Sequence, residues 1–180
     1  MGTISLILTG AVSAQEYTAR LSVHWGPTHH SAIHAKMFAD EVNKRADGRL
    51  RIDYFPSGQL FGVREQLGAV TSGAIEMGGI VGVVSFPPIN KNFNVVSITG
   101  MFDSYGEQRA FFQDDPTGKA VWDGITKKSD SVLLMYDPVG PVMTFSTQEL
   151  NGVKSMSGLK ARALIGACLL YTSDAADDSL

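Results

Sequence analysis

The sequence predicts an α/β fold in which short strands alternate with helices on a mainly parallel sheet. The first observation is the alternation of apolar and polar residues over 18–25 and again over 50–54, which is typical of half-buried strands. The second is the segment between them, 31–45, in which apolar residues recur at helical spacing. A strand, a helix of about 10–15 residues and a second strand form the unit of parallel sheets. Hydrophobic residues make up 44% of the 180, so the chain can bury a core.

Residues that break regular structure mark the ends of these first elements. The first strand ends at the Gly-Pro pair 26–27 and the second at Pro56. The Asp-Gly pair 47–48 ends the helix between them, since glycine suits a left-handed cap. We expect the buried face of this helix to comprise Ile33, Met37, Phe38 and Val42.

The rest of the chain continues the alternation of helices and strands. Apolar residues at helical spacing predict a helix over 63–72 that ends at Gly73. The apolar, Gly-rich stretch 75–84 predicts a strand that is buried on both faces. The remaining expected elements are an extended segment over 93–101, helices over 108–113 and 119–128 with Trp122 and Ile125 inward, and strands over 132–136, 142–146 and 159–164.

The two ends of the chain are expected to lie outside the fold. An apolar run at 4–11 and small residues at 12–14 predict a signal peptide over 1–14. No basic residue precedes Arg20, so a buried first strand remains the alternative. The segment 168–180 continues no pattern before it, and we interpret it as a non-native tail; a genuine frayed terminus is the alternative. Pro and Gly cluster at 137–140, a candidate crossing between domains.

Charge and composition argue against several classes of function. A net charge of -3 and a pI of about 5.7 argue against a nucleic-acid partner, which would require a basic surface. No apolar stretch approaches the ~18–20 residues that span a bilayer, so direct membrane insertion is not expected. The single cysteine, Cys168, cannot form an internal disulfide.

No group of residues makes a convincing metal or catalytic site. His29, His30 and His34 invite a metal interpretation, because the last two could share a helix face. No third ligand stands nearby, so a structural or solvent-facing pair is favoured. The Gly-rich stretch 78–82 lacks the Lys and Ser/Thr of a phosphate-binding loop. We expect no catalytic residue, metal or cofactor.

Several motifs, in order along the chain, resemble one known family. They are Lys-Met-Phe-Ala-Asp-Glu-Val at 36–42, Gly-Arg-Leu-Arg-Ile at 48–52, Tyr-Phe-Pro-Ser-Gly-Gln-Leu at 54–60 and Ser-Gly-Leu-Lys-Ala-Arg at 157–162. Over about 21–164 the chain resembles the substrate-binding proteins of tripartite ATP-independent periplasmic (TRAP) transporters, the DctP type. It departs from them at 99–102, where Thr-Gly-Met-Phe replaces the usual Pro-Phe pair.

The resemblance implies a two-lobe fold like that of periplasmic binding proteins, with a first lobe over 15–137 and the start of a second over 138–167. Members of this family continue well past residue 167, so the second lobe would be incomplete and the chain a C-terminally truncated fragment. We expect such a fragment to bind carboxylates weakly or not at all, and the full-length protein to bind them well.

The function that the resemblance implies is that of a solute-binding protein, not an enzyme. It would capture a small organic carboxylate in the periplasm of a Gram-negative bacterium and deliver it to the membrane subunits of a TRAP transporter. A ligand-sensing domain of a receptor with the same fold remains an alternative, and an α/β enzyme is less favoured.

The resemblance also implies the ligand-binding residues. Arg162, in the Gly-Leu-Lys-Ala-Arg motif, would hold the ligand carboxylate through two parallel hydrogen bonds. His24, beside Trp25, aligns with an asparagine of sialic-acid-binding members. Val81 and Val142 align with a glutamate and an arginine of those members. We therefore expect a ligand with one carboxylate and a small or hydrophobic body.

Overall fold

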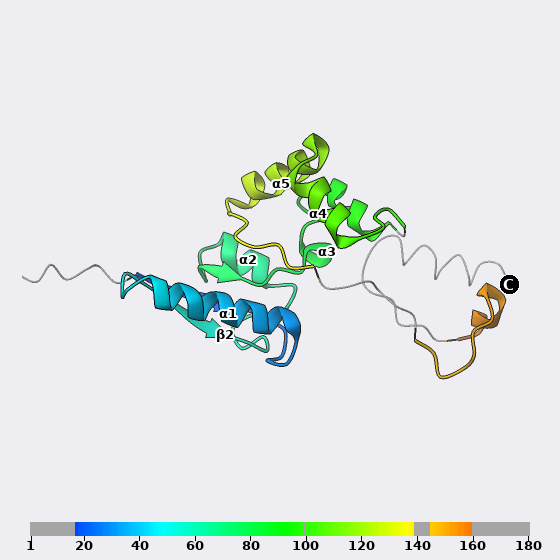
Figure 1. Cartoon of the computed structure of the whole chain (residues 1–180), viewed down its shortest axis with the longest axis horizontal. Helices are drawn as coiled ribbons and strands as arrows, with labels where there is room; N and C mark the ends of the chain where they lie inside the picture. Colours follow the sequence, from blue (N-terminus) through cyan, green and yellow to red (C-terminus); the bar gives the residue numbers. More distant parts are fainter. Residues whose placement is uncertain (1–16, 99, 139–144, 160–180) are drawn as a thin grey trace, which may run out of the picture.

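The computed structural model describes residues 17–98, 100–138 and 145–159. In chain order, its elements are the strand β1 Tyr17–Ser22, the helix α1 His30–Arg45, the strand β2 Leu50–Phe55, the helix α2 Gln66–Thr71, the strand β3 Met77–Gly78, the helix α3 Gly82–Ser85, the 3-10 helix η1 Lys91–Ser97, the helices α4 Tyr105–Gln113 and α5 Pro116–Ser129, and the 3-10 helix η2 Val153–Met156. Figure 1 shows the sheet and α1 at one end of the fold and α4 and α5 at the other, with α2 and α3 between them.

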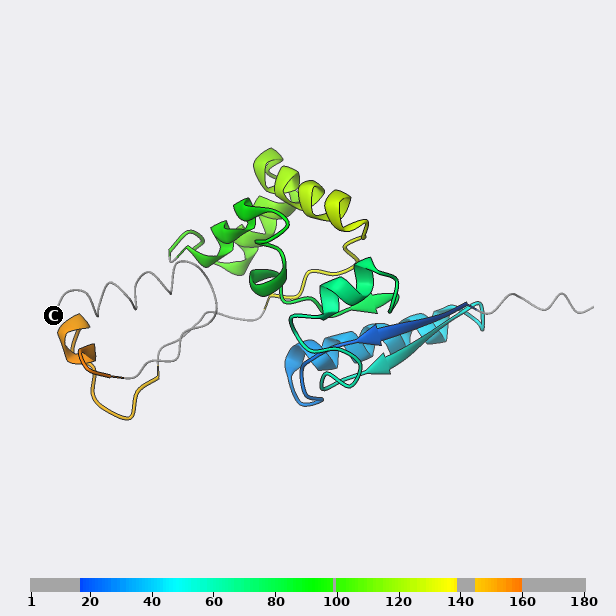
Figure 2. The same cartoon turned by 180° about the vertical axis from the view of Figure 1, so that it is seen from behind.

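The three strands form one parallel sheet in the order β2-β1-β3. Tyr17 pairs in register with Leu50, and Ser22 pairs with both Phe55 of β2 and Gly78 of β3. Figure 2 shows β1 and β2 side by side, with α1 behind them. The predicted α/β fold with parallel strands is therefore confirmed, and the first strand, helix and second strand stand where the sequence predicts them.

The core beneath the sheet uses a different face of α1 from the one expected. Four small residues of α1 are buried, and the three alanines among them pack with residues of β1 and β2, whereas Ile33 is 45% exposed and Met37 is 62% exposed. The buried set on this helix is Ser31, Ala32, Ala35 and Ala39. Alanine lets the helix axis approach the sheet closely, so the small residues, not the largest apolar ones, line the contact. Phe38 and Val42 pack at its margin, as expected.

A second core lies between α3, η1, α4 and α5. Phe86, Phe93 and Phe112 meet there, and each of their rings contacts the partly buried Trp122 edge to face, a favoured geometry. Ile125 is 1% exposed, so the inward direction predicted for 119–128 is confirmed. Helices α4 and α5 touch through Gly118, where a Cβ atom would lie 2.0 Å from the Phe111 carbonyl oxygen.

Two extended segments predicted for the middle of the chain are wrong. Of 75–84, only Met77–Gly78 is a strand; the chain then turns into α3, and a Cβ on Gly82 would lie 2.8 Å from the Phe93 ring. Close packing on this aromatic side chain, not a position in a central strand, explains Gly82. The predicted 93–101 segment is largely the helix η1, which begins where the Asn90 side chain accepts a hydrogen bond from the backbone of Asn92.

The strands predicted for the later part of the chain are not found where the structure describes it. The segment 132–136 forms no strand, and Val132 is 81% exposed because the apolar run pairs with no described strand. The described part of 142–146, residues 145–146, is not a strand either, and only Leu159 of 159–164 is described. The expected signal peptide over 1–14 and the tail over 168–180 lie outside the described residues.

Candidate functional site

The carboxyl ends of the three parallel strands meet at one edge of the sheet, which we call the carboxyl edge and define as residues 23–25, 56–58 and 79–81. Strand β1 lies between β2 and β3, and the chain crosses to one side of β1 and then returns to the other. In open α/β sheets, ligands bind outside the carboxyl ends of strands at such a reversal of strand order. His24 and Trp25 follow β1 at this point, and Val81 follows β3.

Backbone hydrogen bonds hold the carboxyl edge together beyond the ends of the strands. The Val23 amide donates to the Phe55 carbonyl at 2.9 Å, and the Ser57 amide donates to the Trp25 carbonyl at 2.9 Å. On the other side of β1, the Gly79 amide donates to the Ser22 carbonyl at 2.8 Å. The loops that carry His24 and Trp25 are thus fixed on both sides, as a binding site on a rigid scaffold requires.

Gly79 brings the end of β3 directly against the Trp25 ring. A Cβ atom at this position would lie 2.9 Å from Cζ3 of Trp25 and 2.8 Å from Cγ1 of Val23. Any side chain larger than a hydrogen atom would displace one of these two. Sequence reasoning missed this role, although a glycine directly after an apolar strand is the pattern by which such an approach can be recognised.

His24 is partly buried, and its environment favours the neutral ring. Burial lowers the pKa of His24 below its ordinary value, and the neighbouring His29 lowers it further, while the Gly79 backbone acts in the opposite direction. Its Nδ1 atom is buried and has no hydrogen-bond partner among the described residues. At neutral pH, His24 therefore presents an uncharged polar ring at the carboxyl edge.

A row of rings leads from Trp25 along the start of α1. The His29 ring stacks on Trp25, with centroids 5.6 Å apart and planes at 14°, and His29 also caps α1 by accepting a hydrogen bond from the Ser31 amide. His30 follows at 4.4 Å from His29, and His34 at 6.0 Å from His30. Within residues 17–98, 100–138 and 145–159 there is no cluster of three His, Cys, Asp or Glu residues that could hold a metal.

Three of the five predicted ligand-binding residues lie in the described part of the chain. His24 and Trp25 are ring neighbours with centroids 4.1 Å apart, and Val81 lies two residues beyond Gly79, where it precedes α3 and is partly buried. Val142 and Arg162 lie outside the described residues, so their roles stay predictions.

The described cavities lie elsewhere. One of about 250 Å³ lies between α4 and α5 beside Arg109, Trp122 and Tyr136, and its lining shares no residue with the carboxyl edge. No helix of the described residues is long and apolar enough to cross a membrane.

Solved structures of TRAP periplasmic solute-binding proteins share this fold. One from Polaromonas sp. JS666, bound to D-erythronate, is 23% identical with a TM-score of 0.54, and the match covers 63% of this chain and 37% of that one. One from Sulfurospirillum deleyianum, with bound succinate, is 21% identical with a TM-score of 0.57 over 63% and 36%. One from Pseudoalteromonas atlantica, with bound sodium and pyruvate, is 22% identical with a TM-score of 0.54 over 63% and 34%.

This chain therefore spans little more than a third of the length of these structures. Their likeness shows the fold, which is that of periplasmic-binding-protein-like receptors. The model of the DctP family, described as bacterial extracellular solute-binding protein, family 7, matches residues 21–169, which include most of the described fold. That family consists of solute-binding proteins and not of enzymes. The chain belongs to family 7 of the bacterial extracellular solute-binding proteins.

Proposed function

We propose that the chain is part of a receptor that captures a small organic carboxylate in the periplasm of a Gram-negative bacterium and delivers it to a TRAP transporter. The observation that carries this proposal is the family match over 21–169, which includes the three described site residues and Arg162. The membrane subunits of the transporter would be the partner, and a signal peptide over 1–14 would direct export.

The ligands in the similar structures support a carboxylate. D-erythronate, succinate and pyruvate differ in length and hydroxylation, but each carries at least one carboxylate. A planar guanidinium binds such a group through two parallel hydrogen bonds and stays charged at all physiological pH values. Arg162 is the residue we assign to this contact.

The chemistry of the carboxyl edge favours a ligand with one charged end. On this wall the site residues are the neutral His24, the aromatic Trp25 and the aliphatic Val81. With Val142 as a second valine, Arg162 would be the one charged contact among these five. A 2-oxo acid or a simple aliphatic or aromatic monocarboxylate therefore fits better than a hydroxylated acid with two charged anchors.

Two lobes would enclose the ligand. We propose that residues 15–137 form the first lobe and that 138–167 begin the second, whose wall carries Arg162. Hinge closure of two lobes dries the cleft and strengthens the ion pair, and binding shifts the population toward the closed state. On an open wall, the same pair would contribute only about 0–1 kcal/mol.

A chimera tests the proposal directly. Residues 17–167 would replace the matching part of the Polaromonas receptor, which restores two lobes, and calorimetry would titrate the product with pyruvate, succinate and D-erythronate. We expect binding, with pyruvate bound more tightly than D-erythronate. Arg162→Ala should weaken it by about 2–5 kcal/mol, or from about 30-fold to several thousand-fold.

The controls separate a lost contact from a lost fold. Arg162→Lys should also weaken binding, because a point charge cannot replace the two-pronged guanidinium. Arg109→Ala, which removes an exposed arginine of α4, should leave affinity unchanged. A chimera that unfolds cooperatively but binds none of the acids would refute the proposed function, and unchanged affinity in Arg162→Ala would refute the assigned contact.

A further inference from the structure

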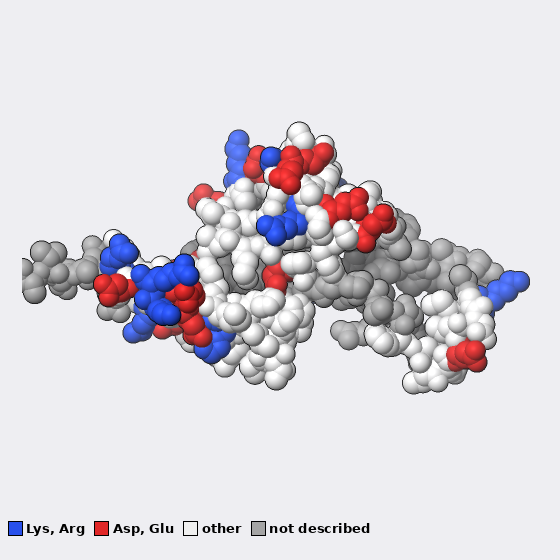
Figure 3. Space-filling model, in the orientation of Figure 1, with Lys and Arg blue, Asp and Glu red and all other residues white. Residues whose placement is uncertain are grey.

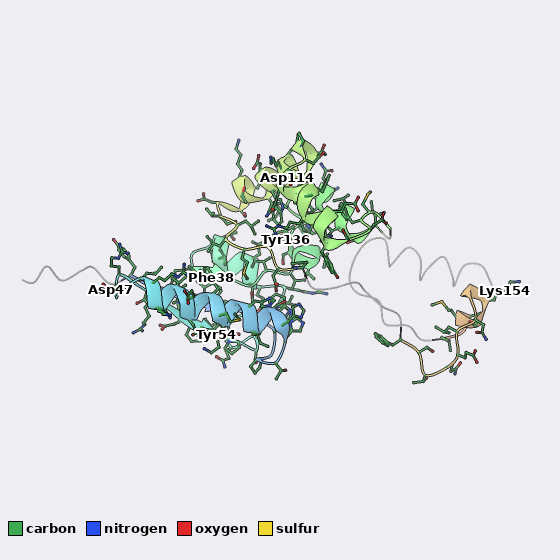
Figure 4. The ribbon with its side chains drawn as sticks, in the orientation of Figure 1. Phe38, Asp47, Tyr54, Asp114, Tyr136 and Lys154 are labelled. Carbon is green, nitrogen blue, oxygen red and sulfur yellow. The ribbon has the colours of Figure 1, made fainter. Side chains whose placement is uncertain are left out.

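Two adjacent residues after α5 connect the two cores of the described fold. The Tyr136 hydroxyl donates a 2.5 Å hydrogen bond to Oε1 of Gln108 in α4, and its ring lies 6.4 Å from that of Trp122 in α5. The next residue, Asp137, has Oδ1 only 2.9 Å from Nδ1 of His34 in α1, a contact between residues 103 positions apart. Figure 4 labels Tyr136 between the upper helices and the layer that contains α1.

Asp137 places a negative charge beside the amino-terminal half of α1. The first turn of α1 contains no acidic residue, although the amino end of a helix favours an anion. Burial opposes the ionised form of Asp137, but the Ser31 hydroxyl and the His34 ring, with the nearby His30, hold the pKa of the carboxyl below its ordinary value. The Asp137 side chain is 20% exposed and that of His34 is 50% exposed, so the carboxylate is the more shielded of the two partners.

A continuous row of ring contacts joins this carboxylate to the carboxyl edge. His34 contacts His30 edge to face at 6.0 Å, His30 contacts His29 at 4.4 Å, and His29 stacks on Trp25 at 5.6 Å. Trp25 contacts His24 at 4.1 Å. These are all four histidines of the chain, and the row contains no other residue type besides Trp25. These contacts link His34 at one end of the row to Trp25 at the other.

We propose that Asp137 is a positioning residue for the carboxyl edge, which sets the orientation of Trp25 through His34, His30 and His29. It touches no proposed ligand contact itself. Asp137 lies at the end of the proposed first lobe, in the segment 130–137 that follows α5, which we call the exit segment. In this proposal, the orientation of Trp25 depends on the position of that exit segment. The importance of Trp25 for ligand binding rests on the proposed function; the coupling itself does not.

Fluorine NMR of the 180-residue chain labelled with 5-fluorotryptophan tests the coupling. The chain has two tryptophans, so two resonances are expected, and Trp25→Phe identifies the one from Trp25. Asp137→Asn and His34→Gln should each shift the Trp25 resonance. Asp40→Asn is the matched control: it removes an exposed carboxylate of α1 that pairs with Lys36 at 2.6 Å, and it should leave the resonance in place.

The double variant distinguishes transmission through the row from independent effects. Asp137→Asn with His34→Gln should shift the Trp25 resonance no further than either single change, since both break the same contact. Additive shifts, or a Trp25 resonance that stays in place while the His34 ring protons move, would overturn the proposal. If circular dichroism shows that Asp137→Asn unfolds, His34→Gln with the same control decides. No ligand is present, so a negative result leaves the proposed carboxylate binding untouched.

Discussion

Replacing Gly79 with alanine perturbs the carboxyl edge with a single methyl group. The added Cβ would lie 2.8 Å from Cγ1 of Val23 and 2.9 Å from Cζ3 of Trp25, distances that real Cβ atoms do not tolerate. Val23 is fully buried in the core beneath the sheet and β-branched, so it cannot move aside. Trp25 is only partly buried, and its ring is therefore the group that must move.

The expected loss of stability follows from the inability of Val23 to move away from the added methyl group. Inserting a methylene into a packed site typically costs about 1–3 kcal/mol. We expect Gly79→Ala to lower the free energy of unfolding by about 2 kcal/mol, because only one of the two contacts can yield. Ligand binding in the chimera should fall further than stability alone requires, since the displaced ring belongs to the proposed site.

Urea denaturation of the 180-residue chain measures the effect, and Gly68→Ala provides the matched control. Gly68 lies in α2 with nothing within 4 Å of the added Cβ, so alanine there should stabilise by about 0.5–1 kcal/mol through helix propensity. The two substitutions add the same atom and should act with opposite sign. Equal midpoints for both variants would refute the close approach of Gly79 to Trp25.

Three further predictions concern the fold. Asn43→Ala should destabilise by about 1–3 kcal/mol in urea denaturation, because the side chain bonds both the amide and the carbonyl of Ile52 on the edge strand β2, at 2.6 and 3.0 Å. Ile125→Ala should cost about 2–5 kcal/mol in the same assay, as expected for a residue that is 1% exposed. Arg20 lowers the pKa of Glu76 from 4.5 to about 2. The contribution of the Arg20–Glu76 interaction to stability is therefore complete above pH 4.5 and is lost as the pH falls toward 2. Melting curves of Glu76→Gln should lack that part of the acid dependence.

The first half of the fold could be predicted because its patterns are local. Alternation over β1 and β2, and the glycine after α1, each report a structure that its own neighbours determine. The face of α1 could not be predicted in the same way. Its large apolar residues, such as Met37, are exposed, and its outer surface mixes opposite charges that pair one turn apart, as Lys36 does with Asp40 (Figure 3). Which face approaches the sheet depends on the space available beneath it.

The second half of the chain depends on contacts that no local pattern reports. An apolar run such as 75–84 fits a buried strand, but it also fits backbone that packs against aromatic rings. Beyond β3, the close approaches of Gly79 to Trp25 and of Gly82 to Phe93 show that the second description holds. The run at 132–136 has the composition of a strand, but strand formation requires a partner, and no described strand pairs with it.

The sequence could predict which residues belong to the candidate site, but not how those residues pack. The resemblance assigns His24, Trp25 and Val81 by position, and the structure locates all three after the ends of β1 and β3. The resemblance does not indicate that Gly79 sets the distance to Trp25 or that His29 supports the Trp25 ring, because those roles arise from the packing of separate segments. The assignment of Arg162 to the ligand carboxylate rests on its sequence motif alone.

The carboxyl edge forms within the first 81 residues, so one wall of the proposed cleft is built before the chain reaches the exit segment at Asp137. Its position is set by backbone hydrogen bonds, and its surface is neutral or apolar at His24, Trp25 and Val81. Such a wall can exclude water and fit a ligand body, but it offers no charge among these residues to hold a carboxylate. In the proposed function, the charged contact would come from elsewhere, and Arg162 would supply it. Selectivity for the ligand body and affinity for its carboxylate are thus assigned to different parts of the chain.

We therefore expect Trp25→Ala in the chimera to change the ranking of the acids by affinity, whereas Arg162→Ala should weaken the binding of all of them alike. Calorimetric ranking of the three acids checks both expectations. A uniform loss of affinity in Trp25→Ala would contradict this division.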